Sequence, residues 1–432
     1  MFKKVSVFLL SLFICGCSVW QNKNTFWGNS QTPTYSTNRS EMTDYSHVDL
    51  GNADSFRVAM LLPLSGSNAS TGQNMKNAVM MAIGDLNNNN LVIQFYDTKG
   101  TGSGARVAFE NAMNADSQLI LGPLLAEEVS AISAPAKSKD VPVICFSTSP
   151  SVLQEGIYTL GLLNDEQIKR IVQYAAASDR HRLAAVFPDD QRGLNMFKSM
   201  MQAAQASGIE VTKVGFYAPT EMDFSGLVTS MISGKNGGDV GFDALLVPES
   251  GNRLKSITSM FSYYDVSAPE VLFLGTSVWA NTGLSKETEL YGAVYPVMSL
   301  SRQEMFEYKY NELFGERPHG LSILAYDAVQ MASDLSRVNQ RNLPVAITRG
   351  EGFNGISGVF RVFANGTNEH GLDIVKVTSG GEQLVDAAPQ EFYGIGNAGN
   401  SGYGYGYGYG YTMPQIYGKS AAELQMLLNN MQ

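Results

Sequence analysis

Ser147, Thr148 and Ser149 are three consecutive hydroxyl side chains that directly follow an apolar run, VPVICF. A hydroxyl becomes a nucleophile when a base takes its proton, and the sequence shows no evident histidine base for this motif. The hydroxyls and their backbone N–H groups are better suited to holding a carboxylate by hydrogen bonds. An equally good interpretation is that they cap the following turn, because Ser and Thr are favoured at such positions.

Other motifs give no support for an enzyme. Gly100, Gly102 and Ala105 match the G-x-G-x-x-A pattern of dinucleotide sites, but the next strand ends in Gly122 and Pro123 instead of an acid for the ribose. We interpret these glycines as the start of a helix after a loop. The histidines show no metal-ligand spacing: His47, His181, His319 and His370. We therefore expect no catalytic residue, no metal and no other cofactor.

The elements that must position these residues begin at Phe56, where apolar runs of strand length start to alternate with helical patterns. The predicted strands are FRVAMLL, LVIQFYD, SQLILG, VPVICF, RLAAVF, DALLVP and EVLFLG. Strands that are apolar throughout and separated by helices indicate an α/β fold with parallel sheets covered on both faces. Such sheets bind ligands beyond the carboxyl ends of their strands. The unusual residues cluster at these ends.

Composition bounds the size and the partners of the protein. A chain of 432 residues with 44% hydrophobic and 16% charged residues can bury a large core and is long for one domain. The 30 basic and 40 acidic residues give a net charge of -10. This acidic balance makes nucleic acid an unsuitable partner.

The N-terminus has the pattern of a lipoprotein export signal. Lys3 and Lys4 precede an apolar run from Val5 to Cys15, which is too short for a bilayer core that needs about 20 residues. The sequence ICGC, residues 14–17, then resembles the lipobox of bacterial lipoproteins. That resemblance implies removal of residues 1–16 and a lipid on Cys17. The alternative is an ordinary signal peptide with incidental cysteines.

Several consequences follow for the mature chain. The residue after Cys17 is Ser18, whereas lipoproteins kept at the inner membrane tend to have Asp at this position. We therefore expect a periplasmic protein anchored at the outer membrane. Residues 17–54, rich in Asn, Ser and Thr, predict a lipidated flexible tether. With Cys17 acylated and Cys15 removed, Cys145 is left as a free thiol, so we expect a buried core cysteine and no intramolecular disulfide.

The C-terminal part changes character. Residues 351–378 alternate in polarity around central turn residues and predict a hairpin. Residues 391–418 include five Gly-Tyr pairs, which we interpret as a flexible spacer in preference to a specific binding strip. Ser420 and Glu423 form a capping box that predicts an amphipathic helix over 419–432. So short a helix needs a surface to dock on.

Five motifs occur in one order along the chain: VAMLLPLSG, DTKGTGSGA, LILGPLLAEEVSAISAPAKSKDVPVICFSTSP, GIYTLGLLNDEQIKRIVQYAA and FNGISGVFRV. In combination they resemble the leucine-binding-protein-like, type I periplasmic binding proteins. The resemblance covers roughly residues 55–380 and extends to the lipoproteins called penicillin-binding-protein activators. It implies two doubly wound parallel-sheet α/β lobes with an interlobe cleft. The first lobe would hold residues 55–165 and 299–345, and the second 166–298 and 350–380.

The resemblance also implies a ligand cleft. In the family's amino-acid receptors, the ligand's backbone groups are held by the positions matching Ser65, Gly122, Ser147 and Ser149. The second lobe commonly adds an aromatic residue before a glycine, but residues 190–193 here read DQRG. Glu249, at the end of DALLVPE, could still meet an ammonium group. The candidate cleft residues are therefore Ser65, Gly66, Gly122, Pro123, Ser147, Thr148, Ser149 and Glu249.

Three functions fit this sequence. The resemblance favours a non-catalytic, lipid-anchored periplasmic protein that activates a bacterial wall synthase, a penicillin-binding protein, by direct contact. The alternative is a solute receptor for an amino acid or small amide that feeds an ABC-type transporter. A third is a structural envelope lipoprotein. The absent second-lobe aromatic favours the first and third over the receptor.

The lipidation site is testable directly. Radiolabelled fatty acid should enter the wild-type protein and Cys15→Ser but not Cys17→Ser, because acyl chains gain about 0.8 kcal/mol per buried CH₂ and supply the membrane anchor. Fluorography of protein from labelled cells measures this incorporation. Labelling that disappears with Cys15 instead would contradict the assignment.

Overall fold

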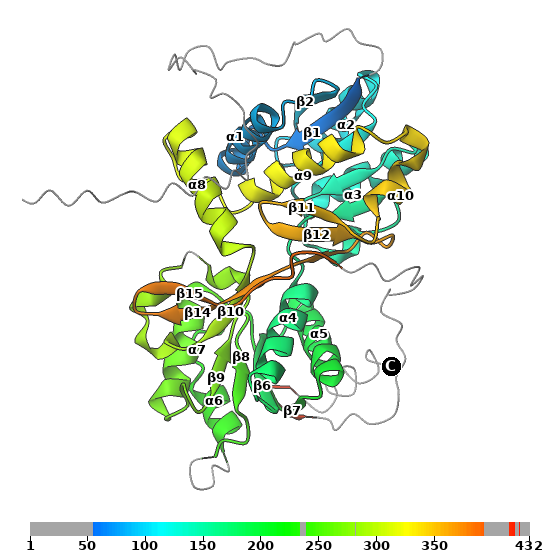
Figure 1. Ribbon diagram of the computed structural model, residues 1–432. Helices are drawn as coiled ribbons and strands as arrows, with labels where there is room; N and C mark the ends of the chain where they lie inside the picture. Colours follow the sequence, from blue (N-terminus) through cyan, green and yellow to red (C-terminus); the bar gives the residue numbers. More distant parts are fainter. Residues whose placement is uncertain (1–54, 234–238, 281, 393–413, 420–422, 424–432) are drawn as a thin grey trace, which may run out of the picture. The chain divides into compact units, whose positions relative to one another are not determined.

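The computed structural model describes residues 55–233, 239–280, 282–392, 414–419 and 423 (Figure 1). The predicted signal peptide, Cys17 and the tether lie outside these residues, as does the predicted C-terminal helix apart from Lys419 and Glu423. In these ranges, none of the helices combines the length and the apolar character that a bilayer crossing requires.

The first lobe is built on a five-stranded parallel sheet in the order β2-β1-β3-β4-β5. Its strands are β1 Phe56–Leu62, β2 Leu91–Asp97, β3 Leu119–Leu121, β4 Val143–Cys145 and β5 Ile157–Thr159. Its helices are α1 Ala69–Leu86, α2 Gly102–Asn114, α3 Ala126–Lys139, α8 Leu300–Phe314, α9 Ser322–Leu335 and α10 Leu343–Ile347. Val58 and Met60 pack with α1 and α9, while Ala59 and Leu61 pack with α2 and α3. Both faces are covered, which explains why the strand is apolar throughout.

The second lobe is built on an eight-stranded sheet in the order β15-β14-β10-β9-β8-β6-β7-β16. Its strands are β6 Arg182–Pro188, β7 Glu210–Tyr217, β8 Ala244–Leu246, β9 Leu272–Leu274, β10 Val294–Val297, β14 Asp373–Thr378, β15 Gly381–Asp386 and β16 Gln415–Tyr417. Its helices are α4 Asn164–Ala177, α5 Gln191–Ser207, α6 Ser225–Ile232 and α7 Gly251–Tyr263. The strands pair in parallel except β14 and β15. The predicted fold of two α/β lobes with parallel sheets is confirmed.

Four strands of the second sheet were not predicted: β7, β10, β15 and β16. β7 reads EVTKVGFY, and Thr212 and Lys213 interrupt its apolar pattern. Lys213 is nevertheless buried, because its ammonium group donates to the carbonyl oxygen of Met231 at 2.6 Å. β16 lies inside the segment 391–418 that we interpreted as a spacer, and the pairing of β16 with β7 contradicts that interpretation for its last residues.

A small antiparallel sheet, β11 Phe353–Gly355, β12 Gly358–Val362 and β13 Asn368–His370, forms from the first part of the hairpin predicted over residues 351–378. Phe353 and Phe360 belong to the same core cluster as β1 and α9. β14 instead pairs with β10 of the second sheet. The segment 350–380, which we assigned whole to the second lobe, is thus divided between the two cores, because its first strands pack on α9.

Within the described ranges, three chain segments connect the two sheets, after β5, after β10 and between β13 and β14. The side chain of Asn368 donates to the carbonyl oxygens of Thr159 and Gly161 at 3.0 and 2.9 Å. The Glu166 carboxylate accepts from the backbone N–H of His370 at 2.7 Å. Buried hydrogen bonds therefore join the segment after β5 to β13, from which the third segment leads to β14.

Asp327 of α9 is a fully buried carboxylate that holds the small sheet in place. Its two oxygens accept from the backbone N–H groups of Ile356 and Ser357 at 2.6 and 2.8 Å. Burial raises the pKa of Asp327 to about 6, against the opposing effect of these hydrogen bonds and of His370. The carboxylate thus ties α9 to the turn between β11 and β12 at an electrostatic cost.

The raised pKa predicts a pH-dependent stability. The Asp327 carboxyl binds its proton more tightly in the folded state than in the unfolded state. The resulting contribution to the free energy of unfolding is complete only below about pH 4 and is lost as the pH rises through about 6. Relative to Asp327→Asn, which cannot titrate, the wild type should therefore lose about 3 kcal/mol of unfolding free energy between pH 4 and pH 7. Urea unfolding at several pH values measures the difference. A constant difference over this range would contradict the buried titration.

Candidate ligand-binding site

The carboxyl ends of β1, β3 and β4 lie side by side at one edge of the first sheet, and Gly122 joins them. Its N–H donates to the carbonyl oxygen of Ile144 at 2.8 Å. Its φ is +92°, and a Cβ there would lie 2.1 Å from the carbonyl oxygen of Leu61. Only glycine lets the backbone after β3 approach β1 this closely. The following residue, Pro123, accepts from the N–H of Phe146 at 3.0 Å.

Ser65, in the exposed loop after β1, is held by a carboxylate that the sequence had not singled out. The Ser65 hydroxyl donates to Asp97, at the end of β2, at 2.6 Å. Burial raises the pKa of Asp97, but hydrogen bonds from the Ser65 hydroxyl and from the N–H groups of Lys99, Ser65 and Leu64 outweigh it, so the pKa is lowered. Gly66 lies beside Ser65 and is exposed. An ionised Asp97 therefore fixes this loop.

Ser147, Thr148 and Ser149 follow β4 and differ in their surroundings. Ser147 is buried, and its hydroxyl oxygen accepts from the N–H of Ser149 at 3.2 Å, a bond of the kind that the turn-capping interpretation requires. Its carbonyl oxygen accepts from the Thr159 hydroxyl at 2.6 Å. Thr148 is exposed. The hydroxyls thus combine a structural role at Ser147 with an open donor at Thr148.

Cys145, the last residue of β4, is buried and free. Burial raises its thiol pKa to about 11, so the thiolate is scarce at neutral pH. This environment is that of a core cysteine.

Glu249 lies at the carboxyl end of the second sheet, just after β8, and its side chain is 6% exposed. Its Oε1 accepts from the Arg192 guanidinium at 2.8 Å and from the Tyr217 hydroxyl at 2.7 Å. Arg192 follows β6 and Tyr217 ends β7, so neighbouring strand ends supply all three groups. Arg192 is 48% exposed, which leaves other N–H groups of its guanidinium at the surface.

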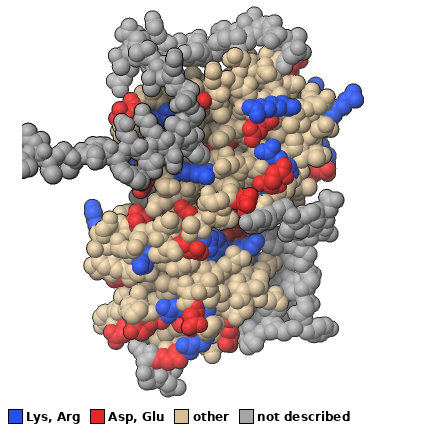
Figure 2. Space-filling model, viewed as in Figure 1, with Lys and Arg blue, Asp and Glu red and all other residues tan. Residues whose placement is uncertain are grey.

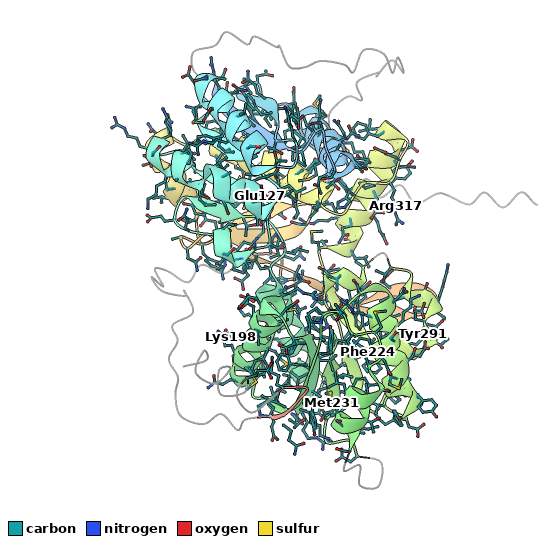
Figure 3. The ribbon with its side chains drawn as sticks, turned by 180° about the vertical axis from the view of Figure 1, so that it is seen from behind. Glu127, Lys198, Phe224, Met231, Tyr291 and Arg317 are labelled. Carbon is teal, nitrogen blue, oxygen red and sulfur yellow. The ribbon has the colours of Figure 1, made fainter. Side chains whose placement is uncertain are left out.

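Each partner of Glu249 is itself positioned. Asp190 caps α5 by accepting from the N–H of Gly193 at 2.8 Å, which fixes the first turn that carries Arg192. The Tyr217 ring packs edge-on against Phe224, with ring centroids 5.2 Å apart. Phe224 lies inside this lobe in Figure 3. Burial raises the pKa of Tyr217, and its hydrogen bond to Glu249 adds to the effect, so the hydroxyl stays a donor.

The structure therefore brings Ser65, Gly122 and Ser147 to neighbouring strand ends of one sheet and places Glu249 on the other. Sequence reasoning missed Arg192 and Tyr217 as partners of Glu249. Residues 190–193 contain no aromatic residue, but Tyr217 at the end of the neighbouring strand β7 supplies one to the cluster. In the described ranges, no cluster of His, Cys, Asp or Glu is arranged to hold a metal ion. Figure 2 shows basic and acidic side chains interspersed over the described part of one face.

Two comparisons of sequence find relatives. The model of the periplasmic binding protein family matches residues 55–382. An uncharacterised protein of Rickettsia prowazekii is 23% identical over 161 residues, which are 37% of this chain and 43% of that protein. The match thus spans less than half of that relative's length.

Solved structures share the fold at low sequence identity. A putative branched-chain amino acid ABC transporter from Rhodospirillum rubrum has a TM-score of 0.68 and 15% identity, covering 77% of this chain and 100% of that one. A solute-binding protein from Rhodopseudomonas palustris, in complex with 3,4-dihydroxybenzoic acid, has a TM-score of 0.57 and 18% identity over 80% and 99% of the two chains. A substrate-binding protein from Streptococcus pneumoniae, in complex with isoleucine, has a TM-score of 0.55 and 17% identity over 78% and 100%.

The Arg192–Glu249 pair should contribute measurably to stability. Arg192→Ala leaves a buried carboxylate with one donor, and we expect a loss of about 1–2 kcal/mol, below the value for fully buried pairs because Arg192 is half exposed. Arg106→Ala is the matched control, since the Arg106–Glu110 pair is exposed on both sides and should change stability by less than about 0.5 kcal/mol. Equal effects of the two variants in urea unfolding would contradict the role of the Glu249 pair.

Proposed function

Because the chain belongs to the periplasmic binding protein family, we propose that it is a solute receptor that closes on an amino acid or a small amide. Family membership indicates a periplasmic location and a binding role. The proposal reverses our preference from sequence, which placed activation of a wall synthase first. Similarity to solute-binding proteins supports the receptor more directly.

The observation that carries the proposal is the Arg192–Glu249–Tyr217 cluster at the carboxyl end of the second sheet. Parallel sheets bind ligands at this end. Arg192 donates one N–H group to Glu249 and is 48% exposed, so its other N–H groups can donate to a carboxylate or amide oxygen of a ligand. The two donors to Glu249 both reach Oε1, and an ammonium or amide N–H of a ligand can donate to Oε2.

The first sheet supplies a donor of a complementary kind. Thr148 is an exposed hydroxyl that can donate to a ligand, while the hydrogen bonds of the Ser65 and Ser147 hydroxyls fix the loops in which they lie. Isoleucine and 3,4-dihydroxybenzoic acid, the ligands bound in two similar structures, both carry a carboxylate. We therefore assign the ligand carboxylate to the loop after β4, an amide oxygen of the ligand to Arg192, and an ammonium or amide N–H of the ligand to Glu249. An ABC-type transporter would be the receiving partner, and lipid on Cys17 would hold the receptor at the membrane.

Activation of a penicillin-binding protein remains a second candidate, favoured by one observation. Glu249 already holds two donors, and Asp190 to Arg192 are used for a helix cap and an ion pair in place of an aromatic wall. A pair that is satisfied within the lobe gives less reason to bind a solute tightly. In that case the outer surface of the protein would carry the function.

Calorimetry decides between the two candidates. Lipid-free protein is titrated with the twenty amino acids, small amides and 3,4-dihydroxybenzoate. The receptor predicts one ligand with a Kd in the micromolar range, about -8 kcal/mol. Thr148→Ala and Arg192→Ala should each weaken it at least tenfold, whereas the remote control Arg106→Ala should not.

A panel without any ligand tighter than millimolar would contradict the receptor. The activator would then predict that crosslinking in intact cells captures wall synthases with this protein. A transporter permease in place of the synthase would instead agree with the receptor.

A further inference from the structure

The short strand β16 occupies the outer edge of the second sheet. It runs parallel to β7 in the register Gln415 to Lys213, Ile416 to Val214 and Tyr417 to Gly215. A strand at the edge of a sheet presents unpaired N–H and C=O groups, which an extended segment can satisfy. β16 is separated by more than twenty residues from the preceding described segment, so it is a tail that returns to the lobe.

The side chains of β16 fit two different surfaces. Ile416 packs against the core cluster formed with α4 and α5, while Tyr417 packs against the cluster on the opposite face, formed with α6 and α7. This alternation follows from the pleat of a strand. The tail is therefore bound by side-chain contacts on both faces of the sheet as well as by its backbone.

Gly418 and Lys419 make the contact specific. Gly418 has a φ of +79°, and a Cβ there would lie 1.9 Å from the carbonyl oxygen of Phe216, so no other residue fits without displacement. The Lys419 side chain is 4% exposed. Its ammonium group forms an ion pair with Asp189 and lies 4.7 Å from the centroid of the Phe216 ring. A lysine this buried needs such a partner.

Asp189 belongs to the loop that carries Arg192. Its N–H donates to the carbonyl oxygen of Tyr217 at 2.7 Å. The next residue, Asp190, caps α5, and Arg192 in the first turn of α5 reaches Glu249. A continuous series of contacts thus runs from Lys419 through the loop to the Glu249 cluster.

We propose that the edge of β7, with Asp189 at its carboxyl end, is a peptide-binding site for an extended segment of the form Ile-Tyr-Gly-Lys, and that the chain's own residues 414–419 occupy it. The docked tail acts as a strap that positions the Asp189–Arg192 loop against Glu249. Lys419 and Asp189 are positioning residues in this arrangement. Any effect of this loop positioning on ligand affinity rests on the proposed function. The docking of residues 414–419 and the ordering of the Asp189–Arg192 loop do not.

Hydrogen exchange of the full-length chain, measured by mass spectrometry without ligand, tests both parts. Gly418→Ala should undock the strap, and segments 210–217 and 186–195 should each exchange at least tenfold faster. Lys419→Ala should accelerate segment 186–195 by a similar factor. Gly283→Ala is the matched control, because Gly283 has a φ of +75° with open space around its Cβ position and should leave both segments unchanged.

A synthetic hexapeptide, PQIYGK, supplied at millimolar concentration to the Gly418→Ala chain, should restore the protection of both segments, while the same peptide with the Gly418→Ala change should not. Unchanged exchange of 210–217 in Gly418→Ala, or no rescue by the peptide, would overturn the binding site. Faster exchange of 210–217 with an unchanged loop in both variants would overturn the positioning role. None of these outcomes depends on whether a solute binds, which calorimetry measures separately.

Discussion

Burial of the inner strands of both sheets on their two faces is the constraint on which the rest of this structure depends. Along β1, successive side chains enter two different cores, so no position within the strand can carry an unpaired polar group without a desolvation cost. Polar groups are therefore displaced to the strand ends. Ser65, Ser147, Arg192, Glu249 and Asp189 all follow a strand directly or within a few residues. The chemistry of the protein is confined to these edges by the packing of its cores.

Once at the edges, the charged groups are held by partners from neighbouring strands. Asp97, from β2, fixes the loop after β1, and Glu249, after β8, joins groups that follow β6 and end β7. Such fixation means that a ligand meets donors and acceptors already in place and does not have to order them. It also sets a limit, because a carboxylate that is already paired gains less from a second cation. If the pre-positioned groups outweigh the prior pairing of Glu249, a solute binds tightly, as the receptor requires. If the prior pairing outweighs them, a solute binds weakly, as the activator allows.

The sequence predicts the parts of the fold that follow from local pattern. Apolar runs identify the buried strands β1 and β6 and the half-buried edge strand β2, and a helical stripe identifies α1. β7 is not identified in this way, because a lysine such as Lys213 is typical of the surface. In the structure its long side chain reaches the carbonyl oxygen of Met231. The Arg192–Glu249 pair joins residues 57 apart in the chain, and no local pattern encodes that contact. The division of residues 350–380 between two cores also depends on tertiary packing, because Phe353 and Phe360 pack beside α9.

The docking of residues 414–419 is another contact that the local sequence pattern does not predict. The composition of the tail is dominated by Gly and Tyr up to residue 411, and that composition hides a binding segment of a few residues behind it. Three strand residues and one ion pair would bind weakly as a separate peptide, because association costs several kcal/mol of translational and rotational freedom. Attachment to the same chain removes most of that cost, because the contact is then intramolecular. A weak but specific contact therefore suffices to close the edge of β7, provided that residue 418 is glycine and residue 419 can reach Asp189. Composition measures how a tract behaves on average, whereas docking depends on those two positions.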